Sequence, residues 1–194
     1  MTGPAGSTAS TEPAGSTAST VTVPTAGAMR ALGEELAALL RPGDLVLLTG
    51  DLGAGKTTLT QGIGRGLRVR GDVTSPTFVI AREHRPTAGG PGLVHVDAYR
   101  LGTLAEVDDL DLDAALDDAV TVVEWGAGLV EGLADSRLEV RLARRRGGVP
   151  APAGSDGDDG DDGDDEDEVR TVELAGIGPR WTGVTLPGAT GAGA

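Results

Sequence analysis

The feature that most constrains this chain is the run TGDLGAGKTT at residues 49–58, which follows the apolar segment DLVLL. Gly50, Gly55, Lys56 and Thr57 match the pattern G-x-x-x-x-G-K-S/T without a gap. Glycines let successive backbone N–H groups turn inward toward a phosphate, and the start of the following helix adds its positive dipole. The sequence therefore predicts a phosphate-binding loop between a buried strand and a helix.

Lys56 is the only lysine, whereas the other fifteen basic residues are arginines. Lysine places a compact charge on a flexible stem, and the larger planar guanidinium of arginine is a poor substitute against nucleotide phosphates. The hydroxyl of Thr57 can bind the Mg²⁺ that accompanies a nucleotide. A chain with 32 glycines can also form a glycine-rich turn by composition alone. The complete motif and its strand–helix context favour nucleotide binding instead.

Two further predicted strands end in carboxylates, LVHVD at Asp97 and VTVVE at Glu124. In an open α/β sheet, ligands lie beyond the carboxyl ends of the strands. Each acid could hold Mg²⁺, directly or through water, or orient an attacking water. Each could equally be a solvated acid at a strand end. Lys56, Asp97 and Glu124 are the predicted catalytic residues.

A hydroxyl-rich loop, with Thr74, Ser75 and Thr77, precedes another predicted strand. It is either an ordinary turn or a switch segment that contacts the γ-phosphate or its metal. Trp125 directly follows Glu124. In a chain so poor in aromatic residues, Trp125 could be core or interface, or it could stack on a base.

Polar residues also flank Asp97 on the same predicted strand. His95 alternates with Asp97 on one face, and a lone histidine in such a place is more often structural than catalytic. Tyr99 and Arg100 follow Asp97. Arg100 could pair with a phosphate or with an acid.

The periodicity predicts an α/β fold like that of P-loop NTPases, with a mostly parallel central sheet, helices on both faces and an antiparallel strand pair toward the C-terminus. Thr25 is a plausible N-cap for the first helix, which Pro42 and Gly43 end. The expected strands are 21–23, 44–50, 78–82, 93–97, 120–124, 137–145 and 168–176, and the expected helices are 25–41, 56–67, 103–119 and a short one at 127–134.

The composition divides the chain further. We predict a disordered repeat tail at 1–20, the core with the phosphate-binding (P-loop) segment at 21–146, a disordered acidic loop at 147–168, the last core strand at 169–182 and a disordered tail at 183–194. Ten of the thirty acidic residues lie at 156–168, so the rest is only mildly acidic. No broad basic face for nucleic acid is apparent.

Several classes of protein and site are excluded or disfavoured. The chain has no cysteine, which excludes a disulfide framework, a thiolate zinc site and a cysteine nucleophile. No apolar run approaches the roughly 18 residues that would cross a membrane. The N-terminal residues lack a basic stretch followed by an apolar one. We therefore expect a soluble cytoplasmic protein.

Four segments, GDLGAGKTTLTQGIGRGL, VTSPTFVI, HVDAYRL and VVEWG, follow one another at close spacings. Together they resemble the bacterial TsaE (YjeE) family, the small ATPase of tRNA N6-threonylcarbamoyladenosine (t6A) biosynthesis. The resemblance covers residues 22–142, with a weaker match at ELAGIGPRW. It implies ATP and Mg²⁺ as cofactors and TsaD and TsaB as partners, with tRNA engaged indirectly through their complex. It also implies that ATP hydrolysis on that complex resets it between cycles.

The resemblance also assigns roles by motif. Lys56 would contact phosphates, Thr57 and Glu124 would bind Mg²⁺, Asp97 would support the metal or the attacking water, and Thr77 would lie near the γ-phosphate. The full set of expected nucleotide-binding residues is Asp51, Leu52, Gly53, Ala54, Gly55, Lys56, Thr57, Thr58, Thr77 and Trp125.

Two other functions stay open. Asp97 with Arg100 is also typical of a small phosphotransferase such as a nucleoside or sugar kinase, although the only candidate for a basic lid, residues 144–146, adjoins the acidic loop. A nucleotide-sensing adaptor without catalysis would carry the same phosphate loop. For the ATPase, we expect slow turnover without partners, because no arginine finger is evident near the loop.

Overall fold

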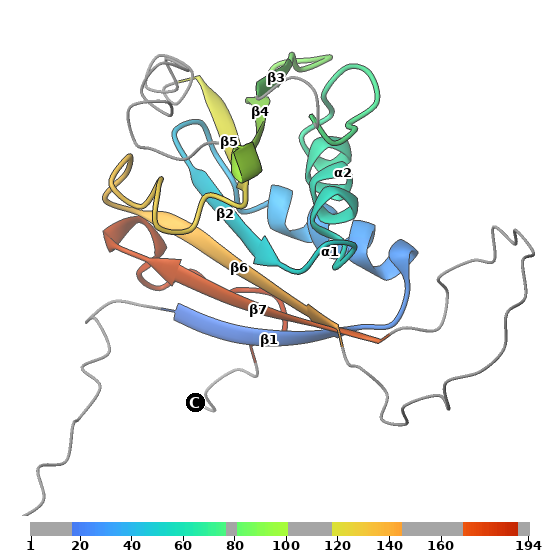
Figure 1. The fold of residues 1–194 in the computed structure, drawn as a ribbon. Coiled ribbons are helices and arrows are strands. Elements are labelled where there is room, and N and C mark those ends of the chain that lie inside the picture. The colour runs from blue at the N-terminus through green and yellow to red at the C-terminus, as the bar shows by residue number, and fades with distance from the viewer. Residues whose placement is uncertain (1–16, 77–80, 101–117, 145–168, 190–194) are drawn as a thin grey trace, which may run out of the picture.

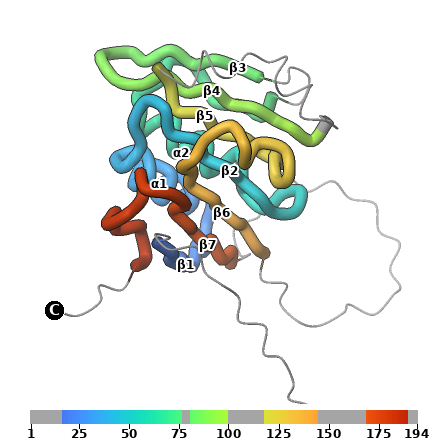
Figure 2. The backbone as a smooth tube through the Cα atoms, turned by 90° about the vertical axis from the view of Figure 1, so that its left-hand side faces the viewer, coloured from blue at the N-terminus to red at the C-terminus, as the bar shows by residue number. Residues whose placement is uncertain are grey.

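The computed structural model describes residues 17–76, 81–100, 118–144 and 169–189 (Figure 1). Strands form one sheet in the order β1-β7-β6-β2-β5-β4-β3, which Figure 2 shows in sequence from β1 at the bottom to β3 at the top. The strands are β1 (Thr17–Val23), β2 (Leu45–Gly50), β3 (Ala81–His84), β4 (Gly92–Asp97), β5 (Ala119–Glu124), β6 (Arg137–Arg144) and β7 (Arg170–Ile177), the helices are α1 (Ala26–Ala37) and α2 (Lys56–Gly66), and two 3₁₀ turns are η1 (Ala98–Arg100) and η2 (Pro179–Trp181).

The centre of the sheet is parallel and its two edges are antiparallel. Strands β6, β2, β5 and β4 run parallel to one another, while β1 and β7 pair antiparallel at one edge and β3 pairs antiparallel with β4 at the other. Strands β2 and β5 are apolar and almost wholly buried, as expected for strands covered on both faces. The predicted α/β class and the parallel centre are confirmed.

Helices α1 and α2 lie side by side on one face of the sheet (Figures 1 and 2). The predicted N-cap is confirmed, because the Thr25 hydroxyl accepts a hydrogen bond from the Ala28 amide at 3.0 Å. The apolar stripe of α1, with Met29, Leu32 and Leu36, is buried in the main core cluster. Its spacing of three to four residues explains why this stretch is helical.

Glycines let the two helices approach closely. A Cβ on Gly62 of α2 would collide with the backbone carbonyl of Arg30 in α1, and a Cβ on Gly33 would collide with the carbonyl of Leu59. These glycines therefore serve packing, although on propensity each costs about 1 kcal/mol relative to alanine.

On the other face of the sheet, the described residues contribute no helix. Among the described residues, the apolar side chains that pack on this face belong to β-strands, to Ala98 and to the segment after β5, including Val130, Leu129 and Leu133. The predicted helix at 127–134 is wrong, since this segment forms a series of turns. Gly128, with a φ of 83°, interrupts any helix there. The other expected helix, 103–119, lies outside the described residues except at its last two positions.

The two ends of the core extend further than predicted. Strand β1 begins at Thr17, inside the segment predicted as a disordered tail, because residues 17–23 pair with β7 along their whole length. Residues 183–189, predicted as part of a disordered tail, also pack on the core. Leu186 is buried, and the Ser19 hydroxyl donates a hydrogen bond to the Pro187 carbonyl at 2.7 Å. Both boundaries are therefore corrected.

Other predictions concern parts of the chain that the structure describes only partly. The strand expected at 78–82 is observed as β3, Ala81–His84, and residues 77–80 lie outside the described ranges. The acidic segment 147–168 and the repeat before residue 17 also lie outside them. No helix within the described ranges combines the length and apolar character needed to cross a bilayer.

Candidate functional site

The phosphate loop joins the end of β2 to the start of α2. Its backbone has positive φ at Gly50 (144°), Gly53 (73°) and Gly55 (101°), a region that side chains with a Cβ rarely adopt. A Cβ on Gly50 would also collide with the carbonyl of Leu142 in the neighbouring strand. The glycines of the motif are therefore required by conformation and by space.

Lys56 is folded back into this loop. Its Nζ donates to the carbonyl oxygens of Gly50 at 2.8 Å and Asp51 at 2.9 Å. The same atom lies 3.9 Å from the centroid of the Trp125 ring, within cation–π range. Burial lowers the pKa of the Lys56 ammonium below its usual 10.5, and nearby carboxylates, Glu124 first, oppose that shift. The only lysine of the chain is thus buried and enclosed by its own loop.

Trp125 is held in a strained position beside the loop. Its φ is 63°, a left-handed backbone that costs energy outside glycine, and its amide donates to the Leu48 carbonyl at 3.2 Å. The Tyr99 ring meets the Trp125 ring edge-on, with centroids 5.5 Å apart. Strain of this kind clusters at functional sites. Trp125 therefore lies at the phosphate loop, outside the main core cluster.

Glu124, the last residue of β5, is the centre of a buried polar group. Its Oε1 accepts a hydrogen bond from the Thr57 hydroxyl at 3.0 Å and lies 2.8 Å from Nε2 of His95. The side chains of His95 and Glu124 are 0% and 4% exposed. Because Thr57 lies in the first turn of α2, these contacts join that turn to two strands.

Asp97, the last residue of β4, stands in register with Glu124 across the parallel β4–β5 pair. Its Oδ1 accepts a hydrogen bond from the Tyr99 amide at 3.1 Å, which closes the turn after the strand. Side chains at paired positions of a sheet project from the same face. The structure therefore brings the two predicted carboxylates together at the end of the sheet where the phosphate loop begins.

These side chains surround a cavity of 540 Å³, within the usual size of small-molecule sites. It is lined by Leu52, Gly53, Gly55, Lys56, Thr57, Thr58, Ser75, Asp97, Tyr99, Glu124 and Trp125. Positive-φ glycines, a helix start, a lysine, a hydroxyl and two carboxylates are the groups that bind a nucleotide phosphate and Mg²⁺. The described residues thus fit both groups.

Two of the predicted nucleotide-binding residues, Ala54 and Asp51, do not line this cavity, and a third lies outside the described residues. Ala54 is buried beneath the loop, in the core cluster. Asp51 borders a second hollow, described below. Thr77 lies outside the described residues, while Ser75 of the same loop does line the cavity. All the other predicted site residues are brought together there.

Sequence reasoning missed a direct contact between the phosphate loop and an arginine. Arg144, at the end of β6, donates through Nε at 3.2 Å and Nη2 at 2.5 Å to the carbonyl oxygen of Gly53. The two residues are 91 positions apart, and the run RLARRR gave no sign of this contact. Arg144 borders the second hollow, and it is absent from the lining of the cavity at the phosphate loop.

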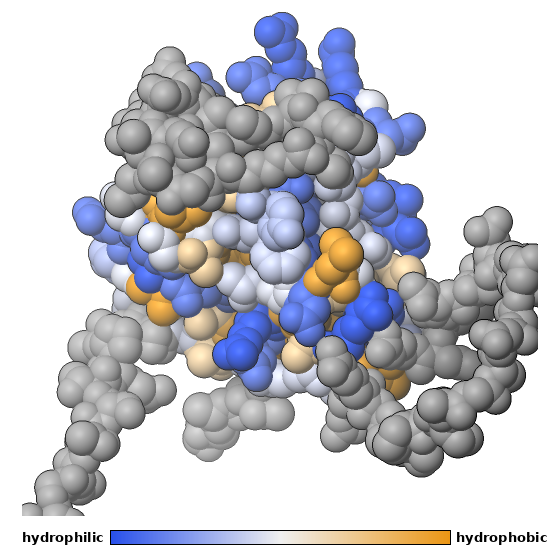
Figure 3. Space-filling view, in the orientation of Figure 1, coloured by the Kyte–Doolittle hydropathy of each residue, from blue (hydrophilic) through white to orange (hydrophobic). Residues whose placement is uncertain are grey.

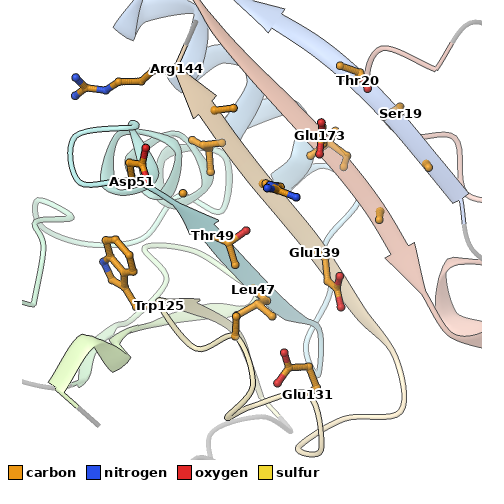
Figure 4. Close-up of a pocket in the computed structure, with 18 residues that line it drawn as sticks. Ser19, Thr20, Leu47, Thr49, Asp51, Trp125, Glu131, Glu139, Arg144 and Glu173 are labelled. Carbon is orange, nitrogen blue, oxygen red and sulfur yellow. The ribbon is translucent and has the colours of Figure 1, made fainter. Parts of the chain in front are cut away.

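The second hollow is a groove of 1110 Å³ over the open face of β1, β7, β6 and β2. Figure 4 shows Trp125 and Asp51 at one side of the groove and Glu131, Glu139 and Glu173 along it. Trp125 lines both hollows. The groove is therefore mixed in character, with four carboxylates and two arginines, and it adjoins the phosphate loop.

Two large hydrophobic side chains are exposed beside the first cavity, at the phosphate loop. Leu52 and Tyr99 are 86% and 71% exposed, and both line the cavity. The face drawn in Figure 3 is otherwise mostly hydrophilic or mixed among its coloured residues, with apolar residues scattered over it. Exposed apolar groups next to a binding site are typical of surfaces that meet another molecule.

Comparison with known proteins identifies the family of this chain. The family model "Threonylcarbamoyl adenosine biosynthesis protein TsaE" matches residues 23–148. Proteins named tRNA threonylcarbamoyladenosine biosynthesis protein TsaE are similar to this chain: that of Streptomyces coelicolor is 57% identical over 79% of this chain and 93% of its own length, and that of Mycobacterium tuberculosis is 52% identical over 63% and 77%.

Relatives in more distant bacteria and a solved structure extend the comparison. The protein of the same name from Bacillus subtilis is 40% identical over 59% of this chain and 71% of its own length. The crystal structure of Bacillus subtilus YdiB is similar to the structure of this chain, with a TM-score of 0.59 and 28% sequence identity. The match covers 86% of this chain and 90% of that one. With the loop, the two carboxylates and the matched core together, this chain belongs to the TsaE family.

Proposed function

We propose that this chain is a cytoplasmic, Mg²⁺-dependent ATPase of tRNA t6A modification that works when docked on a complex of TsaD and TsaB proteins. The observation that carries the proposal is the convergence of Lys56, Thr57, Asp97 and Glu124 on one cavity at the end of β2, β4 and β5. The names of its relatives support the pathway. That the chain uses ATP, Mg²⁺ and the TsaD and TsaB partners is what we propose.

The residues would act as follows. Lys56 leaves the carbonyl oxygens of its own loop and pairs with the β- and γ-phosphates. The Thr57 hydroxyl and Glu124 hold Mg²⁺, which supplies positive charge at the phosphate oxygens when bound. Asp97, in register with Glu124, orients the attacking water or supports the metal. The Trp125 ring, which now covers Lys56, makes room for the phosphates or contacts the nucleotide.

Partner dependence follows from the positive charges near the loop. Arg144 is hydrogen-bonded to the backbone of Gly53 and does not line the nucleotide cavity. In small GTPases, an arginine supplied by a partner raises hydrolysis by about 10⁵-fold. We propose that the TsaD–TsaB complex supplies or positions a further positive charge at the phosphates, and that tRNA contacts the complex and not this chain.

ATP hydrolysis by this chain, alone and mixed with the matching TsaD and TsaB proteins, tests the proposal. We expect turnover that is slow alone and rises strongly in the mixture. Lys56→Ala should abolish both, and Arg65→Ala, on the same helix but outside the cavity, should leave both unchanged. Chelation of Mg²⁺ with EDTA should stop hydrolysis.

Other outcomes would point elsewhere. ATP binding that depends on Lys56, with no effect of the partners, would retain the nucleotide site and reject the partner-activated role. ADP released only with a nucleoside or sugar would then favour a phosphotransferase. Binding without any turnover, with or without partners, would favour a nucleotide-sensing adaptor.

A further inference from the structure

His95 is buried on β4, the strand next to the edge strand β3, but it is not enclosed by apolar groups alone. It lies on β4, two residues before Asp97, and its side chain is 0% exposed. Its Nε2 lies 2.8 Å from Oε1 of Glu124. A buried polar side chain in contact with a carboxylate of the proposed nucleotide site can fix the orientation of that carboxylate.

The chemistry of the two groups sets the direction of this hydrogen bond. An ionised carboxylate only accepts, so Nε2 of His95 carries the hydrogen and donates it. No described residue offers a hydrogen bond to Nδ1, the other ring nitrogen. In the neutral imidazole with hydrogen on Nε2, Nδ1 is only an acceptor, and no buried N–H donor is left unpaired. The imidazole thus has one polar contact, and that contact is Glu124.

The same carboxylate oxygen also receives the Thr57 hydroxyl, at 3.0 Å. Two donors from two elements therefore fix Oε1 of Glu124, one from β4 and one from the first turn of α2. Among the described residues, none donates a hydrogen bond to Oε2 of Glu124. Oε2 is the oxygen left available for a ligand.

We propose that His95 is a positioning residue: its Nε2–H and the Thr57 hydroxyl hold Oε1 of Glu124, so that Oε2 is oriented for Mg²⁺ in the nucleotide complex. The inference rests on the proposed function, because it concerns the metal that accompanies ATP. A donor behind a metal-binding carboxylate fixes its orientation, and loss of such a donor typically weakens metal affinity or activity about 10- to 100-fold.

The test measures the affinity for a non-hydrolysable ATP analogue by calorimetry, with Mg²⁺ and with EDTA. The ratio of the two affinities reports on the metal, separately from turnover. His95→Leu removes the donor and retains much of the volume. His95→Gln retains an amide N–H that reaches the place of Nε2, whereas the shorter His95→Asn reaches only as far as Nδ1.

The gain from Mg²⁺ is the ratio of the analogue's affinity with Mg²⁺ to its affinity in EDTA. We expect His95→Leu and His95→Asn to lower this gain by about 10-fold or more. Their affinity in EDTA should change less than about twofold. His95→Gln should restore most of the gain. Thr121→Val is the matched control, because Thr121 is a buried β5 residue whose hydroxyl has no partner among the described residues. It should leave the gain unchanged.

The outcomes separate this inference from the proposed function. A folded His95→Leu or His95→Asn protein with the wild-type gain from Mg²⁺, or one weakened equally in Mg²⁺ and in EDTA, overturns the positioning role and leaves the ATPase proposal standing. If His95→Leu does not fold, the contrast between His95→Gln and His95→Asn decides in the same way. A wild-type protein that binds no ATP overturns both.

Discussion

The ammonium of Lys56 lies 3.9 Å from the centroid of the Trp125 ring and donates to two carbonyl oxygens of its own loop. Both contacts use the charge that a nucleotide phosphate would use. A phosphate that draws Lys56 away therefore changes the surroundings of the Trp125 indole. The fluorescence of Trp125 and the effect of substituting Lys56 on ATP affinity both report on this relationship.

Nucleotide binding should change the fluorescence of Trp125. The chain has only two tryptophans. The other, Trp181, is fully buried in the main core cluster, which also contains the apolar side chains of α1. We expect an ATP-dependent change that persists in Trp181→Phe and disappears in Trp125→Phe. A signal that follows Trp181 instead would contradict the placement of Trp125 at the nucleotide.

Lys56→Arg should weaken ATP binding, although it retains the charge. A planar guanidinium is larger than the compact Lys56 ammonium and differently hydrated, so it is a poor substitute against nucleotide phosphates. A lost charged hydrogen bond costs about 1.5 to 3 kcal/mol, which corresponds to about a 10- to 100-fold weaker affinity. The converse exchange Arg65→Lys on the same helix is the control, and equal affinities of Lys56→Arg and wild type would refute the prediction.

Gly62→Ala should destabilise the fold, despite alanine's higher helix propensity. The added methyl would collide with the backbone carbonyl of Arg30, so the helices must separate, and overpacking of this kind costs about 1 to 3 kcal/mol. Gly27→Ala in α1 is the control, since its methyl would meet only the Thr25 hydroxyl at 3.6 Å. Urea unfolding should show a loss for Gly62→Ala and no loss for Gly27→Ala. A stabilised Gly62→Ala would show that helix propensity outweighs packing there.

His84 should make the fold less stable in mild acid. Burial lowers the pKa of His84 below its usual 6.5, opposed by a hydrogen bond with the Arg70 carbonyl and reinforced by His95 and Arg82. The unfolded chain then binds a proton more readily than the folded one, so stability falls as pH drops below about 6.5 toward the lowered pKa. Between pH 7.5 and 5.5, the unfolding midpoint temperature (Tm) of His84→Leu should fall less steeply than that of the wild type. Parallel profiles would show that His84 titrates alike in both states.

Much of the site could be predicted because its signals are local in the sequence. The phosphate loop needs glycines at set positions in one short run, and the Thr25 cap lies three residues from the amide it accepts from. Asp97 and Glu124 were placed correctly because each ends a short apolar strand, and parallel strands end at the same edge. Such inferences need no knowledge of which segments pack together.

The tertiary structure decided what depends on distant partners. His95 contacts Glu124 across 29 residues, and Arg144 contacts Gly53 across 91. Strand β1 begins at Thr17 because β7 pairs with it, although its Thr and Ser residues carry no apolar signal. The segment after β5 packs as turns because the sheet beneath buries its apolar side chains without a helix. The sequence by itself determined the chemistry of the loop and the strand ends, since backbone conformation and strand direction are local. Which donors surround Glu124 and where the core ends were decided by the fold, because packing brings together residues that no short pattern connects.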